Sequence, residues 1–419
     1  MKKLLAVGVV MILFITLFCP ISSGVFAAEE KTPVVIGANL PMTGPSARTG
    51  LECWRSIELA VKEINEAGGV LGRPLKVILE DNESRPKSGV DAAHKLVEIN
   101  RVPAVIGGYC SSQAFPVGGY LNSVGIPFIT TATTEKLRYI GPYVFNAACT
   151  ASQQLSLVDF AIQDLGAKKI ASLTQNNPIG QDRARYSKEY IDTIPGVEQI
   201  TTVLYEVGKK DYRAEVMRTF EGKPDAILAD IYAKDARIIF KQAYEMGYTD
   251  EPEERAKWYQ YAIGAVIASG LSEPIEGQKG QDYGATIFGG RGPDFTKAFT
   301  DMFGERPINV WANSFYDAAW ILAIAINMAN STEPDAIRDA LYPAGWVYVG
   351  IGDLGYKEFD IYGMQATVAF QNVHIVNGEI VPYEKLGIEK VIKFHHPGEM
   401  GIGRRTAPTQ EEIERIYEE

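Results

Sequence analysis

The stretch VVIGANLPMTGPSARTGLECWRSIELAVKEINEAGG (34–69) contains the pattern that decides the fold. It begins with an apolar run, Val34 to Ala38, which predicts a buried strand, and continues through a loop at 41–50. Gly68 and Gly69 end the segment, as glycine commonly does at a helix C-terminus. Between loop and glycines, apolar residues recur at steps of three or four and share one helix face: Leu51, Trp54, Ile57, Val61 and Ile64.

The same alternation of short β-branched runs and helical segments continues along the chain. Strands are predicted at 75–79, 104–106, 128–130, 169–173, 226–229 and 258–262, and helices at 90–99, 153–165, 183–194, 234–246 and 315–329. Strands separated by helices indicate an α/β fold built from βαβ units with parallel sheets. Because the series restarts near Lys169, we expect two lobes of similar build. After Gly363, antiparallel strands are expected at 366–370, 373–376 and 379–381, the last two joined by an Asn-Gly turn.

The first residues indicate export. Two lysines precede an apolar run from Leu4 to Phe18, which is the order of a secretory signal peptide. The run is shorter than the roughly 20 residues that span a membrane. Cleavage after Ala27 would make 1–27 the signal peptide and the protein periplasmic or otherwise extracytoplasmic. The alternative is a lipoprotein anchored at Cys19, which Phe18 disfavours because a small side chain is expected before such a cysteine.

Composition narrows the possible partners. The formal net charge is −11, which argues against nucleic acid as a partner because phosphate binding requires clustered lysine and arginine. No later segment is a continuous apolar run of spanning length, so we expect the processed protein to be soluble. Cys53, Cys110 and Cys149 would permit one disulfide, and the sequence leaves the pairing open. No CxxC spacing occurs, so we expect no structural zinc site. The adjacent His395 and His396 could bind a metal, but without nearby carboxylates we expect them to be polar surface.

Catalytic motifs are absent from the sequence. It contains no GxSxG, no HExxH, no GxxxxGK[ST] and no GxGxxG after the first strand. We therefore expect no catalytic residues and no cofactor. A secreted enzyme remains a distant alternative, which would require an unfamiliar catalytic arrangement.

Two polar loops carry the chemistry that the sequence does show. GGYCSSQ (107–113) and TTATTEKL (130–137) each follow a predicted parallel strand. Ser111, Ser112, Thr133 and Thr134 place hydroxyls beside N–H donors at helix starts, an environment that favours a carboxylate. Simple helix capping is the alternative for any one of them. Two such loops on successive strands favour a shared ligand site.

Several segments, in the same order over nearly the whole processed chain, resemble one protein family. The chain resembles periplasmic substrate-binding proteins of the leucine/isoleucine/valine-binding type, the receptors of branched-chain amino-acid ABC transporters. The segments are VVIGANLPMTGP (34–45), VKEINEAGGVLGRPL (61–75), IGGYCSS (106–112), IPFITTATTEKL (126–137), FYDAAWILAIAINMA (315–329) and NVHIVNGEIVPY (372–383). The resemblance implies the type I periplasmic binding protein fold, with two Rossmann-like lobes joined by a three-crossing hinge.

The resemblance also implies boundaries and a function. Lobe one would comprise 30–149 and 285–355, lobe two 150–284 and 356–395, and 396–419 would be a C-terminal extension. The monomeric protein would capture an amino acid or related small carboxylate by hinge closure. It would deliver the ligand to a membrane ABC permease whose ATPase is a separate protein. The alternative is a sensory binding protein that presents a small aromatic or aliphatic carboxylate or amide to a membrane receptor.

By the same resemblance, four residues have specific roles in the site, and a fifth departs from the family's pattern. Ser111, Ala132 and Thr134 stand where the family holds the ligand carboxylate, and Tyr232 stands where a tyrosine covers the ligand. Thr49 stands where an aromatic residue is common. These placements complete the candidate ligand site, which comprises Tyr109, Ser111, Ser112, Ala132, Thr133, Thr134, Asp230 and Tyr232.

The second lobe departs further from the family's pattern. Ile179 replaces a tyrosine, and neither Ala262 nor Ile263 is the acid that would pair with a ligand ammonium group. Burying an ammonium group without a counter-charge costs several kcal/mol. Either another acid, such as Asp230, supplies the charge, or the ligand has no ammonium group. An apolar or aromatic ligand body could face several aromatic residues, whose alternative role is core packing: Tyr109, Phe115, Tyr232, Tyr259 and Tyr261.

Overall fold

The computed structural model describes residues 31–283, 291–307, 311–351, 357–360, 362–366, 368–386, 388–391, 394–396 and 399–401. The expected signal peptide (1–27), with Cys19, and the last residues, 402–419, lie outside this part of the chain. Within it, no helix combines the length and apolar character that crossing a membrane requires.

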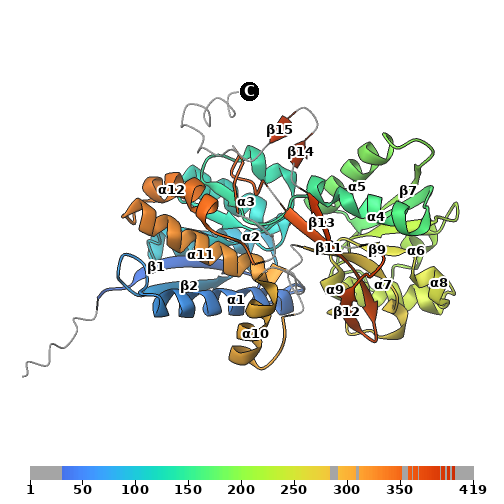
Figure 1. Ribbon diagram of the computed structural model, residues 1–419, viewed down its shortest axis with the longest axis horizontal. Coiled ribbons are helices and arrows are strands. Elements are labelled where there is room, and N and C mark those ends of the chain that lie inside the picture. Colours follow the sequence, from blue (N-terminus) through green and yellow to red (C-terminus); the bar gives the residue numbers. More distant parts are fainter. Residues whose placement is uncertain are drawn as a thin grey trace, which may run out of the picture. The chain divides into compact units, whose positions relative to one another are not determined.

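The first sheet has five parallel strands in the order β2-β1-β3-β4-β5 (Figure 1). These strands are β1 (Val34–Leu40), β2 (Leu75–Asp81), β3 (Val105–Gly107), β4 (Phe128–Thr130) and β5 (Val144–Asn146). One face packs on α1 (Ala47–Glu66), α10 (Gly292–Phe303), α11 (Trp311–Ala329) and α12 (Pro334–Val347). The other packs on α2 (Pro86–His94), η1 (Lys95–Ile99) and α3 (Ser111–Ser123). Successive strand residues point to opposite faces, so Ile36 joins the first of these cores and Val35 the second.

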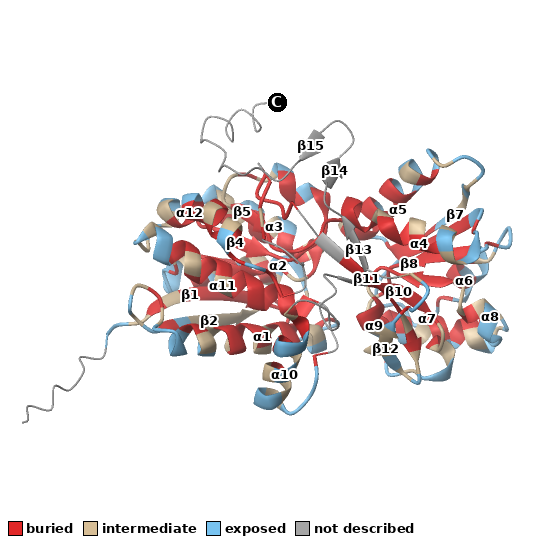
Figure 2. Cartoon of the chain, viewed as in Figure 1, coloured by how far each residue is buried: buried red, intermediate tan, exposed pale blue. Residues whose placement is uncertain are grey.

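The second sheet is mixed, with the order β12-β11-β10-β9-β8-β6-β7 and β13 paired to β11. Parallel strands β6 (Lys169–Gln175), β7 (Glu198–Tyr205), β8 (Ala226–Ala229), β9 (Trp258–Gln260) and β10 (Lys279–Tyr283) form most of it. Helices α4 (Ser156–Leu165) and α5 (Pro178–Ile191) cover one face. Helices α6 (Arg213–Thr219), α7 (Ala233–Glu245) and α9 (Ile263–Ile267) cover the other. Figure 2 shows that the central strands of both sheets are buried, and the edge strands β2 and β7 are only partly buried.

The shorter elements complete the architecture. The turns η2 (Glu135–Tyr139) and η3 (Ala151–Leu155) flank β5, and α8 (Pro252–Arg255) and η4 (Glu273–Ile275) lie near β9 and β10. Antiparallel strands β11 (Val368–Val376), β12 (Glu379–Pro382) and β13 (Ile388–Val391) finish the second sheet. Strands β14 (Phe394–His396) and β15 (Glu399–Gly401) pair with each other.

The Asn-Gly turn predicted near the end of the chain is confirmed. It connects β11 to β12, and both Asn377 and Gly378 have positive φ angles, of 53° and 76°. A two-residue hairpin turn of this kind requires that conformation at both positions. The prediction of separate strands at 366–370 and 373–376 is wrong, because one continuous strand, β11, pairs with β10, β12 and β13.

The chain passes between the two sheets three times: after β5, between β10 and α10, and before β11. Before the last crossing, Phe359 stacks edge-on against Phe145 of β5, with ring centroids 5.3 Å apart. Met364 then forms a bridge with Asn146. The crossing segments are therefore packed against the end of the first sheet. The lobe boundaries expected from the sequence stay a prediction.

Replacing Phe145 with alanine should lower the free energy of unfolding by about 3–5 kcal/mol. The ring is fully buried and also contacts Tyr342, at a centroid distance of 5.2 Å, so truncation opens a cavity that its neighbours cannot fill. Chemical denaturation of the two proteins measures the difference. The control is Ile99→Ala, at a side chain that is 74% exposed, where a change within about 0.5 kcal/mol is expected. Equal effects of the two substitutions would contradict this account of the core.

Candidate functional site

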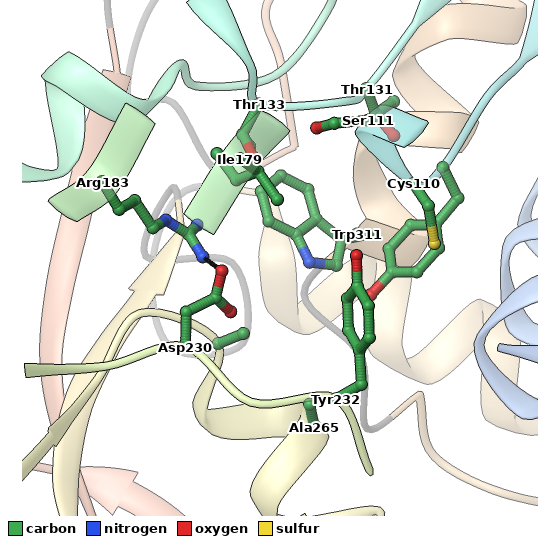
Figure 3. Close-up of a pocket in the computed structure, with 12 residues that line it drawn as sticks. Cys110, Ser111, Thr131, Thr133, Ile179, Arg183, Asp230, Tyr232, Ala265 and Trp311 are labelled. Carbon is green, nitrogen blue, oxygen red and sulfur yellow. Dashed lines mark ion pairs between the residues drawn. The ribbon is translucent and has the colours of Figure 1, made fainter. Parts of the chain in front are cut away.

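Residues from the loops and helices beside both sheets line a cavity with about 40 Å³ of space free for water-sized molecules (Figure 3). Most of them follow the carboxyl ends of β3, β4, β8 and β9 or lie in the first turns of α5 and α11. This edge is where open α/β sheets commonly bind ligands. The lining residues are Tyr109, Cys110, Ser111, Thr131, Thr133, Ile179, Arg183, Asp230, Tyr232, Ala262, Ala265 and Trp311.

The start of α3 supplies hydrogen-bond donors to the cavity. Cys110 is the N-cap residue in an extended conformation, and Ser111 is the first residue of the helix. The first N–H groups of a helix have no partner within it, and the helix dipole adds positive potential at this end. The hydroxyl of Ser111 lies in the same cavity wall. This part of the wall is therefore complementary to an anion.

Thr131, in the loop after β4, adds a hydroxyl that the protein itself leaves unused. Its Oγ1 is buried and has no hydrogen-bond partner within the described structure. Leaving a buried polar group unpaired costs about 1–3 kcal/mol, so such a group at a cavity wall indicates a partner outside the chain. Thr133 lines the cavity two residues later.

Helix α5 brings two further side chains to the cavity because it begins very close to β6. At Gly180, in its first turn, an added Cβ atom would lie 1.9 Å from the carbonyl oxygen of Gln175, so only glycine fits there. Ile179 and Arg183 are four residues apart on this helix and therefore share one face. Both line the cavity.

The Arg183 side chain forms a buried ion pair with Asp230, which follows β8 (Figure 3). The guanidinium Nε also donates to Oε1 of Gln154, at 2.9 Å, and the group lies over the ring of Tyr261, 4.7 Å from its centroid. Among the described residues that line the cavity, Arg183 and Asp230 carry the only formal charges. Because they pair with each other, the cavity has donors but little net charge.

The Cys110 and Tyr232 side chains of the wall are neutral at physiological pH. Burial raises the pKa of the Cys110 thiol to about 11 and raises the pKa of the Tyr232 hydroxyl well above its usual value. The Tyr232 hydroxyl accepts a hydrogen bond from Nδ2 of Asn177, at 3.1 Å. Its own proton is therefore retained and can be donated.

The structure brings five of the eight candidate residues into this cavity: Tyr109, Ser111, Thr133, Asp230 and Tyr232. Ser112 lines a neighbouring cavity instead. Ala132 packs in the core beneath the first sheet. Of the other aromatic residues considered, Tyr259 and Tyr261 are core residues, and Phe115 is exposed on α3.

Thr134 has a partner within the protein. Its hydroxyl donates to Oδ2 of Asp182, on α5, at 2.5 Å, and the N–H of Glu135 donates to the same oxygen at 3.0 Å. Asp182 is buried, so this contact is shielded from water. A carboxylate of the protein therefore occupies the donors that the resemblance assigned in part to the ligand.

Sequence reasoning missed five residues of the wall: Cys110, Thr131, Arg183, Ala265 and Trp311. Thr131 lies in the quoted TTATTEKL loop, so its position after a strand was a usable signal. Arg183 lies one helical turn after Ile179, a position already considered. Trp311 begins a helix far along the chain, and no local pattern connects it to the site.

Two α/β bodies, joined by three crossings and enclosing a cavity at facing strand ends, define a two-lobed ligand-binding protein. The model of the family described as "Periplasmic binding protein" matches residues 33–371 of the sequence. The chain belongs to the periplasmic binding protein family, and its fold is the type I fold of that family.

Relatives and solved structures agree with this assignment. An "Amino acid binding protein" of Pseudomonas aeruginosa is 28% identical over 351 residues, which cover 79% of this chain and 87% of that protein. The branched-chain amino-acid transporter binding protein LivJ of Streptococcus pneumoniae, solved with isoleucine, matches with a TM-score of 0.74 and 23% identity, covering 86% and 99%. A Rhodopseudomonas palustris solute-binding protein, solved with 3,4-dihydroxybenzoic acid, matches with a TM-score of 0.75 and 22% identity, covering 87% and 99%.

The Arg183–Asp230 pair can be tested with a double-mutant cycle. Arg183→Met leaves a buried carboxylate unpaired and should lower the free energy of unfolding by about 3–5 kcal/mol. Adding Asp230→Asn should restore roughly 1–3 kcal/mol of that loss, because the stranded charge is removed. Chemical denaturation of the four proteins measures the coupling. Arg213→Met, at an exposed ion pair, is the control and should cost less than about 1 kcal/mol. Additive effects in the cycle would show that the two side chains are not paired.

Proposed function

We propose that this protein is an extracytoplasmic solute-binding protein of an ABC importer that captures a small carboxylate by closing two lobes around it. The lobes would be 30–149 with 285–355, and 150–284 with 356–395. A membrane permease with a separate ATPase would receive the ligand from the closed form. The observation that carries the proposal is a cavity wall rich in donors whose two formal charges are already paired with each other.

Donors in the first lobe support a carboxylate as the anchoring group. The α3 N-terminus and the Ser111 hydroxyl face the cavity, and the Thr131 hydroxyl lacks a partner. Hydrogen bonds to an ionised acceptor are roughly twice as strong as those between neutral groups. A ligand carboxylate would satisfy all three, and the helix dipole would add to its binding.

The second lobe supports a ligand without an ammonium group. Asp230, the acid that could have supplied the counter-charge, is already paired with Arg183. Ala262, at the position where related amino-acid receptors would carry an acid, lines the cavity with a methyl group. An ammonium group would have to break the existing pair or remain uncompensated, and either costs several kcal/mol. The Rhodopseudomonas palustris protein, with its benzoic acid ligand, is a precedent for such solutes on this fold.

Aromatic side chains support an apolar, preferably flat, ligand body. Tyr109 and Trp311 meet edge to face in the cavity wall, with ring centroids 6.4 Å apart, and Tyr232 enters from the second lobe. Flat apolar groups pack well against such walls. The proposal contains no covalent step, since Cys110 and Tyr232 keep their protons at neutral pH. We therefore expect binding and release of an unchanged ligand.

A thermal-shift screen tests the proposal directly. The protein is unfolded and refolded beforehand to remove any carried-over ligand. The panel contains amino acids, their keto and hydroxy analogues, benzoate, other aromatic and short-chain carboxylates, and neutral amides. A ligand at 100 times its dissociation constant adds about 2.7 kcal/mol of stability. We expect stabilisation by carboxylates with an apolar or aromatic body, benzoate among them. Stabilisation by neutral amides alone, or by nothing in the panel, would contradict the proposal.

Thr131→Val is the matched variant for this screen. It should leave the unliganded melting temperature unchanged or slightly higher, because an unsatisfied buried hydroxyl is replaced by a methyl group of similar size. It should weaken binding of the best carboxylate about tenfold or more, since a hydrogen bond to an ionised group is lost. Unchanged affinity would show that the carboxylate does not bind at Thr131.

A further inference from the structure

A second cavity, with about 220 Å³ of space free for water-sized molecules, adjoins the ligand cavity and shares Cys110 and Tyr232 with it. Figure 3 labels both shared residues. Polar side chains of both lobes line this second cavity: Ser46, Ser84, Ser112 and Gln113 from the first, and Asn177 and Glu206 from the second. The ligand proposed above does not use this space.

Only neutral side chains separate the two cavities. Tyr232 is fixed by the hydrogen bond that its hydroxyl accepts from Asn177. The Sγ of Cys110 lies 3.4 Å from Oγ of Ser46, within hydrogen-bonding distance for sulfur. Turning the Tyr232 side chain would break one hydrogen bond between neutral groups and no ion pair. A substituent of the ligand could therefore extend from the first cavity into the second.

Several donor groups of the second cavity are already used. Nε2 of Gln113 donates to Oγ of Ser112, at 2.9 Å. The hydroxyl of Ser84 donates to the carbonyl oxygen of Thr43, at 2.8 Å. The Nδ2 group of Asn177 donates to Tyr232, as described. A ligand group that only accepts hydrogen bonds would find few donors here.

The second cavity still has oxygen atoms that can accept hydrogen bonds, and one of them has no partner. Oε1 of Gln113 is buried and makes no hydrogen bond within the described structure. Oδ1 of Asn177 accepts only the N–H of Gly180 among the hydrogen bonds that the structure describes, at 3.1 Å, and a carbonyl-type oxygen can accept two. Glu206, the one formally charged residue among the described lining residues, would repel a second carboxylate. The cavity is therefore complementary to an uncharged donor.

We propose that this second cavity is an extension subsite, in which Gln113 accepts a hydrogen bond from a hydroxyl or amide N–H group at the far end of a carboxylate ligand. The inference rests on the proposed function, because it places the ligand carboxylate in the first cavity. The substrate class is then an elongated, apolar-bodied monocarboxylate with a terminal hydroxyl or amide group. Shorter carboxylates bind through the first cavity alone.

Calorimetric titration with three probes tests the subsite. They are benzoate, 4-(2-hydroxyethyl)benzoate and 4-propylbenzoate, of which the last two have nearly the same shape and differ in a terminal hydroxyl. The unmodified protein should bind the hydroxyethyl probe about threefold to tenfold more tightly than the propyl probe, the effect of one hydrogen bond. Gln113→Met removes the acceptor and should abolish this preference while leaving the affinity for benzoate unchanged. Gln113→Glu keeps an acceptor and should keep the preference.

The outcomes separate the subsite from the proposed function. If benzoate binds but the two longer probes are not distinguished, or if the preference survives in Gln113→Met, the subsite is wrong and the proposed function stands. If no probe binds to the refolded, unmodified protein, both are contradicted. Melting temperatures of the two variants establish that they are folded. If Gln113→Met does not fold, the Gln113→Glu variant tests the subsite by itself. Loss of the preference for the hydroxyethyl probe in Gln113→Glu would then overturn the subsite.

Discussion

The ion pair between Arg183 and Asp230 determines what the cavity can bind. Both side chains are buried, and either charge alone would cost several kcal/mol to keep away from water. Because Arg183 and Asp230 pair with each other, the side of the cavity formed by the second lobe has no free charge. The first lobe then dominates the electrostatics through the N-terminus of α3 and the hydroxyls of Ser111 and Thr131. Because the first lobe supplies donors and the second lobe supplies no free charge, we favour a carboxylate ligand that lacks an ammonium group.

A second carboxylate, Asp182, shapes the site from within the protein. It binds the hydroxyl of Thr134 and the N–H of Glu135, and so connects α5 to the loop after β4. The contact joins elements that pack on different sheets, so it holds the start of α5 against the loop after β4. Gly180 makes the contact possible, because only a residue without a side chain lets α5 begin so close to β6. The same helix start positions Arg183 at the cavity.

Local patterns in the sequence predicted most of the fold. The alternation of strands and helices, the Asn377–Gly378 turn and the α1 helix that ends before Gly68 all depend on interactions between near neighbours in the chain. Strands β5, β7 and β10 and helices α6, α10 and α12 were not predicted. Helix α12 contains Pro343, which disfavours a helix in a local reading of the sequence. The loops after β3 and β4 identified Ser111 and Thr133 for the same local reasons. The Arg183–Asp230 and Thr134–Asp182 contacts, by contrast, join residues far apart in the sequence, and no spacing rule indicates them.

The most direct test of the central claim compares ligands that differ only in the ammonium group. Isothermal titration calorimetry would compare phenylalanine with 3-phenylpropanoate, and leucine with 4-methylpentanoate, on the refolded protein at neutral pH. In each pair we predict that the carboxylate without the amine binds more tightly, by at least tenfold, a difference of about 1.4 kcal/mol. Tighter binding of the amino acid in both pairs would mean that Asp230 or another acid compensates the ammonium group, and would contradict the account.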